Sequence, residues 1–337
     1  MDRGPWRLTV VTNPDECNLA CSMCATHAPE ARLARGTRPG PPRRLSLRQV
    51  VTALEGAPPS VVEVIPSTRG EPLLWAGLPG LADACRARGL RLNVTTNGTF
   101  PGVGAEWWAR RLLPACRDVK ISWEGASAEL DRALMGGRDP RRARADLRTV
   151  VAVRDELAGA GHPRCGVSLQ VAARQENLDE LSELVRLAAE EGLDRVKVNH
   201  LQVHFPSLEP SSLRGSAEAA RRWNEAVRDV RLAAEASPRR GGGTVALEGL
   251  AELPEDGSRP PPGDCPFVGR EAWLEVDGRF LPCPSPAARA GALGDLGSLD
   301  DGTLAEAWAG EAWASLRTGW RDRAPCRDCS FRRPGGA

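Results

Sequence analysis

Three cysteines near the N-terminus have a spacing that suits metal chemistry. Cys17, Cys21 and Cys24 follow the pattern C-x3-C-x2-C, just after an apolar run, Leu8–Val11, that predicts a first strand. Cysteine thiolates hold iron–sulfur clusters, and three ligands would leave one iron of a [4Fe–4S] cube open to an outside molecule. A zinc site that includes His27 and a disulfide framework are the alternatives.

Four further cysteines lie near the C-terminus. Cys265 and Cys283 bracket alternating apolar residues around Asp277-Gly278, a pattern that predicts a β-hairpin, and Cys326-x2-Cys329 follows. A four-cysteine zinc ribbon is the alternative to a cluster here. The preceding stretch is dense in Pro, Gly and acidic residues, which is typical of a linker. We therefore expect a domain over 1–250, a linker over 251–264 and a second domain over 265–337.

Composition narrows the class of protein. The chain has 337 residues, of which 41% are hydrophobic and 26% charged, as in ordinary soluble proteins. A net charge of +1 without a long basic block argues against a nucleic-acid partner. Neither a signal peptide nor an apolar run of membrane length is evident. Ten cysteines without an export signal indicate metal or redox chemistry in the cytoplasm.

The predicted elements alternate between strands and helices. The predicted strands cover 8–11, 61–65, 91–95, 119–123, 166–171 and 196–200. Helices are predicted from the N-cap Ser46 to 54, over 81–88 and 106–113, up to about 158, and over 178–191. Such βα units build a parallel sheet, whose functional groups gather at the carboxyl ends of the strands. We expect a solvated outer helix within 207–240 and a short strand at 244–247.

The first cysteine motif, together with Gly70-Glu71-Pro72 after the second strand, resembles the radical S-adenosylmethionine (SAM) superfamily. The resemblance implies an α/β fold, a partial (β/α)6 TIM-like barrel in which a [4Fe–4S] cluster on Cys17, Cys21 and Cys24 binds SAM. The C-terminal cysteines resemble the truncated SPASM domain called twitch, a small β-hairpin plus helix domain. That likeness implies an auxiliary [4Fe–4S] cluster on Cys265, Cys283, Cys326 and Cys329.

The same resemblance implies roles for individual residues. Met23 is expected against the SAM adenine, and Gly70, Glu71 and Pro72 at the SAM ammonium group. Arg69 stands where relatives have a glycine, a departure that leaves those contacts open. Asn97 and Ser122 follow the third and fourth strands and are placed to reach SAM or substrate. The candidates for a catalytic base are Glu124, Arg174, His200 and His204.

Twitch and SPASM enzymes modify either sugars and aminocyclitols or ribosomal peptides. The first cysteine motif begins at Cys17, which leaves no room for a leader-binding domain. We therefore expect the substrate to be a sugar or aminocyclitol of an aminoglycoside-type antibiotic pathway. Cys85, Cys116 and Cys165 lie away from the carboxyl ends of the strands, so no hydrogen donor for epimerisation is evident. We therefore expect a dehydrogenase that oxidises a secondary alcohol to a ketone. A flavodoxin- or ferredoxin-type protein is expected as its one-electron reductant. A sugar epimerase and a ribosomal-peptide maturase are the alternatives.

Overall fold

The computed structural model describes residues 4–36, 40–67, 69–256, 263–327, 329 and 331–332. Residues 257–262 of the predicted linker lie outside this set. The chain divides into two compact units. The first unit comprises Met1–Glu16, Pro41–Asn93 and Pro261–Ala337, and the second comprises Cys17–Gly40 and Val94–Pro260. Within the described ranges, no helix is long and apolar enough to cross a membrane.

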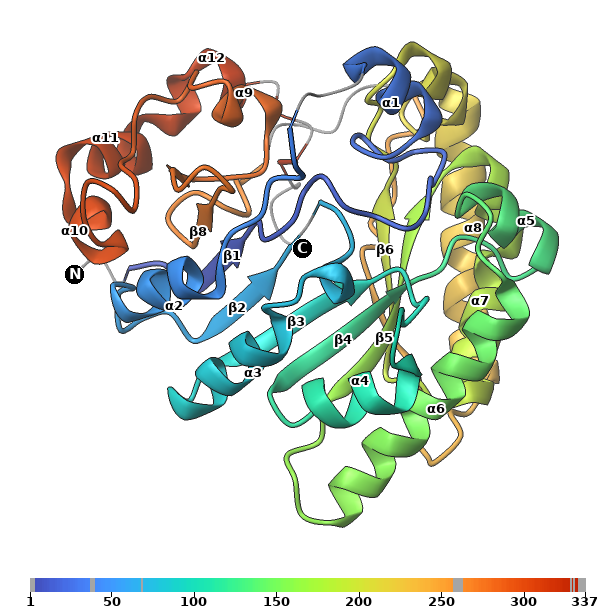
Figure 1. Ribbon diagram of the computed structural model, residues 1–337. Helices are drawn as coiled ribbons and strands as arrows, with labels where there is room; N and C mark the ends of the chain where they lie inside the picture. The colour runs from blue at the N-terminus through green and yellow to red at the C-terminus, as the bar shows by residue number, and fades with distance from the viewer. Residues whose placement is uncertain are drawn as a thin grey trace. The chain divides into compact units, whose positions relative to one another are not determined.

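The first unit is built on parallel strands with a hairpin at one edge (Figure 1). Its strands are β1 (Arg7–Val10), β2 (Glu63–Pro66), the start of β3 (Arg91–Thr96), β8 (Glu271–Leu274) and β9 (Phe280–Leu281). Strand β1 pairs in parallel with both β2 and β8, and β9 pairs antiparallel with β8. The predicted hairpin is therefore present, and it also extends the parallel sheet beside β1.

The helices of the first unit are α2 (Leu47–Glu55), α3 (Leu78–Ala87), α9 (Pro286–Arg289), α10 (Leu304–Ala309), α11 (Glu311–Gly319) and α12 (Ala324–Arg327), with 3₁₀ turns at Pro72–Leu74 and Trp320–Asp322. The helix expected in the C-terminal domain is two helices around Trp308 and Trp313, α10 and α11, which meet at Gly310. Ser46 caps α2 as predicted, since its hydroxyl accepts from the Gln49 amide while the Gln49 side chain accepts from the Ser46 amide.

The second unit carries β4 (Cys116–Ser122), β5 (Gly166–Ala173), β6 (Arg195–His200) and β7 (Ala246–Glu248), which are parallel and adjacent in that order. Its helices are α1 (Pro29–Arg35), α4 (Gly104–Leu112), α5 (Ala128–Leu134), α6 (Pro140–Gly159), α7 (Leu181–Glu191) and α8 (Ala217–Ala236), with 3₁₀ turns at Gln175–Glu180 and Pro206–Ser211. Helices α4, α6, α7 and α8 form a row along one face of β4, β5 and β6 (Figure 1). We expect the functional groups of this unit at the carboxyl ends of these strands.

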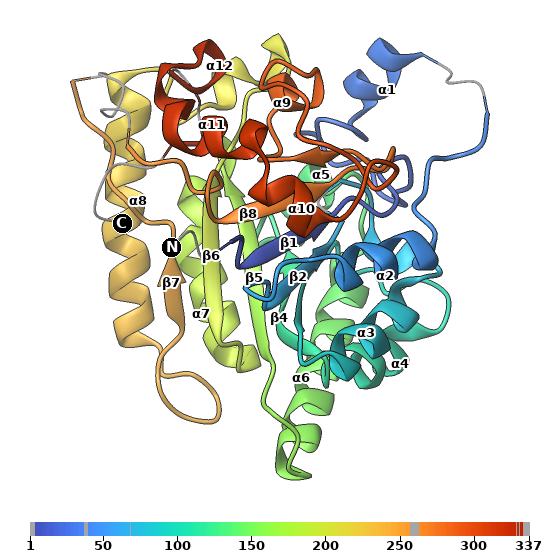
Figure 2. The same cartoon turned by 90° about the vertical axis from the view of Figure 1, so that its left-hand side faces the viewer.

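Helix α8 differs from its prediction. The expected solvated helix packs an apolar stripe against α7 and β7, next to which it lies in Figure 2. Trp223 is fully buried, and its indole N–H donates to the Ala251 carbonyl at 2.9 Å. The rest of the buried stripe consists mainly of Ala and Val residues. Because these side chains are small and arginines are abundant in the helix, the amphipathic pattern is weak in the sequence.

Candidate active site

The loop of residues 17–24, here called the cluster loop, is held at its start by the residue that follows β3. The Asn97 side-chain amide donates to the Asn18 Oδ1 at 2.8 Å and lies 3.8 Å from the Cys17 Sγ. The Thr99 amide and hydroxyl both donate to the Asn97 Oδ1, at 3.0 and 2.7 Å. This network fixes the Asn97 side-chain orientation. Asn97, predicted near SAM or substrate, thus positions the first cysteine.

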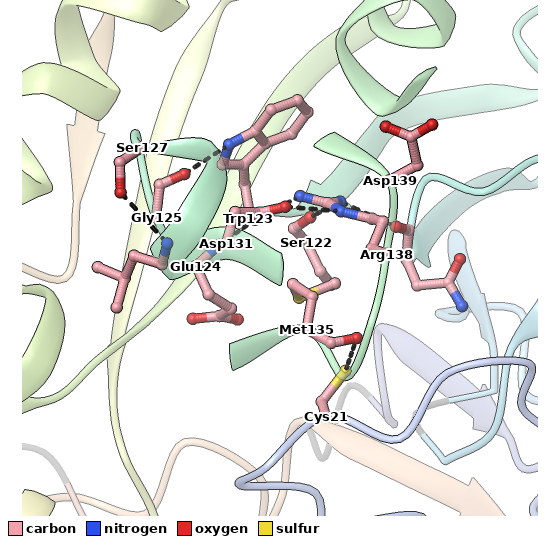
Figure 3. Close-up of polar contacts among 12 residues, drawn as sticks. Cys21, Ser122, Trp123, Glu124, Gly125, Ser127, Asp131, Met135, Arg138 and Asp139 are labelled. Carbon is pink, nitrogen blue, oxygen red and sulfur yellow. Dashed lines mark hydrogen bonds and ion pairs between the residues drawn. The ribbon is translucent and has the colours of Figure 1, made fainter. Parts of the chain in front are cut away.

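The middle of the cluster loop rests on the end of α5. The Ser22 amide donates to the Leu134 carbonyl at 3.0 Å, and the Cys21 Sγ lies 3.6 Å from the Met135 carbonyl, a contact drawn in Figure 3. Gly136 has φ +66°, and a Cβ there would lie 2.3 Å from the Ala20 carbonyl carbon. Only glycine allows this close approach.

Arg174, at the end of β5, grips the same loop. Its Nη1 donates to the Ser22 Oγ at 3.0 Å and its Nη2 to the Ser211 Oγ at 3.0 Å, while Nε and Nη2 also bind the Glu176 carboxylate. Burial acts to raise the pKa of Glu176, but hydrogen bonds from Arg174 and Ser211 outweigh it and lower that pKa to about 2. With its guanidinium so engaged, Arg174 fits an anchoring role better than the predicted role of base.

The three thiols of the cluster loop lie close together. Burial, with smaller contributions from the neighbouring Cys24, Glu124 and Cys17, raises the pKa of Cys21 to about 12. Such thiols lose their protons when iron binds them. In the described part of the chain, no three His, Cys, Asp or Glu side chains form a site for a single metal ion. No disulfide joins any of the ten cysteines, all of which are described. Three free thiols in one loop are the type of donor that holds an iron–sulfur cluster.

The loop after β2 is packed against the residues that precede the cluster loop. Gly70 has φ +81°, and a Cβ there would lie 2.2 Å from the Asn13 carbonyl oxygen. The Glu71 amide donates to the Glu16 carbonyl at 2.7 Å, and the Glu71 carboxylate accepts from the Leu73 amide at 3.1 Å, capping the turn that Pro72 begins. The predicted SAM motif is thus held by the backbone that directly precedes Cys17 in the sequence.

A residue that sequence reasoning missed, Arg138, joins several strand ends. Its side chain is 1% exposed and pairs with the equally buried Asp131 at 2.6 Å. Arg138 Nη1 also donates to the carbonyls of Asn97 and Ser122, at 3.0 and 2.7 Å, and the guanidinium stacks on Trp123 (Figure 3). Only its place after Gly136-Gly137 at the end of a helix hints at this role in the sequence.

Glu124 is a candidate base whose charge acts on Cys21. It is buried after β4, and its Oε2 accepts from the Ala172 amide at 2.9 Å. Burial raises the pKa of Glu124 to about 8, although the Ala172 amide and Arg138 act against this. A carboxyl with a pKa near neutrality suits proton transfer.

The two candidate histidines have different surroundings. His200 packs edge-on against Trp223 of α8, with ring centroids 4.6 Å apart, and its Nδ1 accepts from Arg214 at 3.4 Å. Burial, with Arg214 second, lowers the pKa of His200 to about 4. His204 is exposed beside Phe205. The remaining predicted residues, Met23 and Ser122, are half-buried.

The four C-terminal cysteines also lie near one another. Burial raises the pKa of Cys283, where Cys265 and Cys329 add to the effect, and raises that of Cys326 to about 11. The Val268 amide lies 3.4 Å from the Cys265 Sγ. Phe267, two residues after Cys265, contacts Trp273 and Phe331 and packs with Val11 and Leu281.

Comparison with known families decides the class. A family model described as the Radical SAM superfamily matches residues 14–188, just over half of the chain. The chain belongs to the radical SAM superfamily. A second model, described as an iron–sulfur cluster-binding domain of SPASM type, matches residues 265–330. The cofactors are those expected from the cysteines, namely SAM and two [4Fe–4S] clusters.

The curated relatives of this radical SAM protein include a peptide cyclase and a maturase. The chain is 28% identical over 266 residues to the PqqA peptide cyclase of Streptomyces rochei, covering 78% of this chain and 67% of the relative. It is 29% identical over 189 residues to the mycofactocin maturase MftC of Mycolicibacterium smegmatis, covering 56% of this chain and 41% of the relative. It therefore spans less than half of that maturase.

A solved structure confirms the fold class. Streptococcus suis SuiB bound to S-adenosylmethionine superposes with a TM-score of 0.67 at 19% identity, over 98% of this chain and 71% of that chain. The fold is the partial TIM-like barrel of the radical SAM superfamily, as the sequence predicted. The expected sugar-modifying subtype gains no such support, since these relatives favour the peptide-maturase alternative.

Proposed function

We propose that the protein is a radical SAM maturase that modifies a peptide. The observation that carries this proposal is the similarity to a peptide cyclase over 78% of the chain. It replaces the oxidation of a sugar alcohol as the preferred function. A single-electron donor of flavodoxin or ferredoxin type and a cytoplasmic location remain part of the proposal.

In the proposed reaction, one group of residues holds the SAM-binding cluster and another fixes the loop that carries its ligands. When bound, the cluster passes an electron to SAM, whose cleavage provides a radical that removes a hydrogen atom from the substrate. Cys17, Cys21 and Cys24 hold that cluster. Asn97 and Arg174 fix the loop that carries these cysteines, because they bind Asn18 and Ser22.

Glu124 is the proposed base that removes a proton from the substrate. It is buried beside Cys21, and its raised pKa favours proton exchange near neutral pH. The C-terminal cysteines would hold the auxiliary cluster, which would supply an acceptor for the second electron. Removal of one hydrogen atom, one proton and one electron leaves the peptide two hydrogens lighter, as in a new cross-link.

The test is a reaction under argon with reconstituted enzyme, SAM, dithionite and two substrate panels. One panel holds short peptides encoded beside the gene, and the other holds aminocyclitols and amino sugars. We expect 5′-deoxyadenosine to form together with a peptide that has lost two hydrogens, as measured by mass spectrometry. Turnover of an aminocyclitol without any change in the peptides would refute the proposal. A control with Cys21→Ala should yield no 5′-deoxyadenosine.

A further inference from the structure

Arginines gather in the first unit where β1, β2 and β8 end. Arg43 binds the Asp15 carboxylate with two hydrogen bonds, of 2.8 and 2.9 Å. Arg69, the residue that departs from the family pattern, pairs with the buried Glu275. The backbone before Arg69 is strained, since Ser67 has φ +49° and its hydroxyl donates to the Arg69 carbonyl. The fold thus holds Arg69 in a defined place.

A third arginine of this group, Arg289, lacks an anion. Among the described residues its guanidinium makes no hydrogen bond or ion pair, and its Nε is buried without a partner. Burial is the main cause of a lowered pKa of Arg289. The positive charges of Arg69 and Arg43 also lower this pKa, whereas the carboxylate of Glu275 raises it. The charges that act on Arg289 are therefore two cations and one carboxylate, and that carboxylate is already bound by Arg69.

This arrangement leaves a positive charge uncompensated. The three guanidinium groups face two carboxylates, because Asp15 and Glu275 are paired with Arg43 and Arg69. The nearby Asp277 is engaged by Arg279 at 2.9 Å. A partly buried cation without a partner is costly, and a planar guanidinium matches a carboxylate with two parallel hydrogen bonds.

We propose that Arg289, with Arg69 and Arg43 beside it, binds a side-chain carboxylate of the peptide substrate. This rests on the proposed function and names the substrate feature that it recognises. Asp15 lies two residues before Cys17, and Arg69 directly precedes Gly70-Glu71. Two residues of chain span at most about 7 Å, so the group begins close to the cluster loop.

The test compares matched probes on holoenzyme with both clusters and SAM. Equilibrium dialysis under argon measures acetyl-Ala-Glu-Ala-amide against acetyl-Ala-Gln-Ala-amide, and D-glucuronate against D-glucose. We expect the Glu peptide to bind about tenfold more tightly than the Gln peptide. Arg289→Gln should bring this ratio to about one, and Arg289→Lys should restore part of it. Arg88→Gln is the matched control, since Arg88 pairs with Glu55 in the same unit and is unrelated to the site.

Each other result overturns the inference. Equal binding of both peptides to the unaltered enzyme removes the carboxylate preference. An equal loss for both peptides in Arg289→Gln, with altered iron content, indicates a structural role. Weakened SAM binding alone assigns Arg289 to the SAM carboxylate. A preference confined to glucuronate refutes the peptide as ligand, and with it the proposed function. If peptides are modified without any carboxylate preference, only this inference fails.

Discussion

The two cysteine groups of this protein are supported in different ways. The cluster loop is held by polar side chains from separate elements, with Asn97 at Asn18 and Arg174 at Ser22. Near the C-terminal cysteines the chain packs through aromatic rings, since Phe267, two residues after Cys265, contacts both Trp273 and Phe331. Hydrogen bonds fix the orientation of a loop, whereas contacts between aromatic rings hold chain segments together by apolar packing. In the proposed function the first group holds the cluster that binds SAM and the second group holds the auxiliary cluster.

The strongest test of this comparison removes one thiol from each group. Cys21→Ala should abolish 5′-deoxyadenosine formation and lower the iron content by about half, because one of two clusters is lost. Cys283→Ala should lower the iron content equally but retain SAM cleavage. Iron and sulfide assays, with chromatography of 5′-deoxyadenosine, measure both effects. The comparison breaks if Cys283→Ala stops SAM cleavage as completely as Cys21→Ala.

A second test asks whether Glu124 acts on the substrate rather than on the cluster loop. Glu124→Gln keeps the shape of the side chain and the acceptor for the Ala172 amide, but it cannot take a proton. We expect product formation to fall by about 10²-fold while SAM cleavage persists. The ratio of product to 5′-deoxyadenosine reports this directly. His204→Gln, at an exposed position, is the control, and an equal loss there would remove Glu124 from its proposed role.

How far the sequence predicts such a site depends on the distance between partners along the chain. The cysteine spacing, the capped helix at Ser46 and the strand at β5 are local patterns, and the structure confirms the helix cap and the strand. The cysteines as cluster ligands remain a prediction. Arg138 is different because its structural role is to bind Asn97, Ser122 and Asp131, which lie in separate elements of the chain. No local periodicity encodes such a convergence of strand ends.

The same limit applies to β8 and to the domain division. The hairpin is evident from alternating residues around Asp277-Gly278, but its parallel pairing with β1 joins residues more than 260 positions apart. Arg7 of β1 binds both Glu63 of β2 and Glu271 of β8. These three charged side chains meet because their strands are neighbours in the sheet. The division at 251–264 therefore remains a prediction.

A third test measures the anchoring strength of Arg174. Arg174→Gln removes the cation that binds Glu176 and Ser22, and Glu176 is itself partly exposed to water. We therefore expect about 2 to 3 kcal/mol of lost unfolding free energy and a cluster loop that retains less iron. The control is Arg222→Gln, whose partner Asp179 is 87% exposed and whose loss should cost less than about 0.5 kcal/mol. Urea unfolding measures both. Equal costs would show that the loop is not held by this contact.

The smallest effect we expect is a dependence of stability on pH in the unit that carries the cluster loop. The folded protein holds His200 neutral, because burial lowers its pKa to about 4 from an ordinary value of 6.5. The unfolded chain therefore binds a proton that the folded chain refuses, and stability falls as the pH drops from about 7 toward 4. The loss amounts to about 2 kcal/mol at pH 4.5.

His200→Gln should flatten this slope even if it lowers stability at every pH through the lost Trp223 contact. The exposed His162 provides the matched control, since His162→Gln should leave the slope as it is. Urea unfolding of the three proteins between pH 4.5 and 7.5 measures the difference. An unchanged slope in His200→Gln would show that His200 takes up protons in the folded state. That outcome would return His200 to the candidates for the catalytic base and weaken the assignment of that role to Glu124.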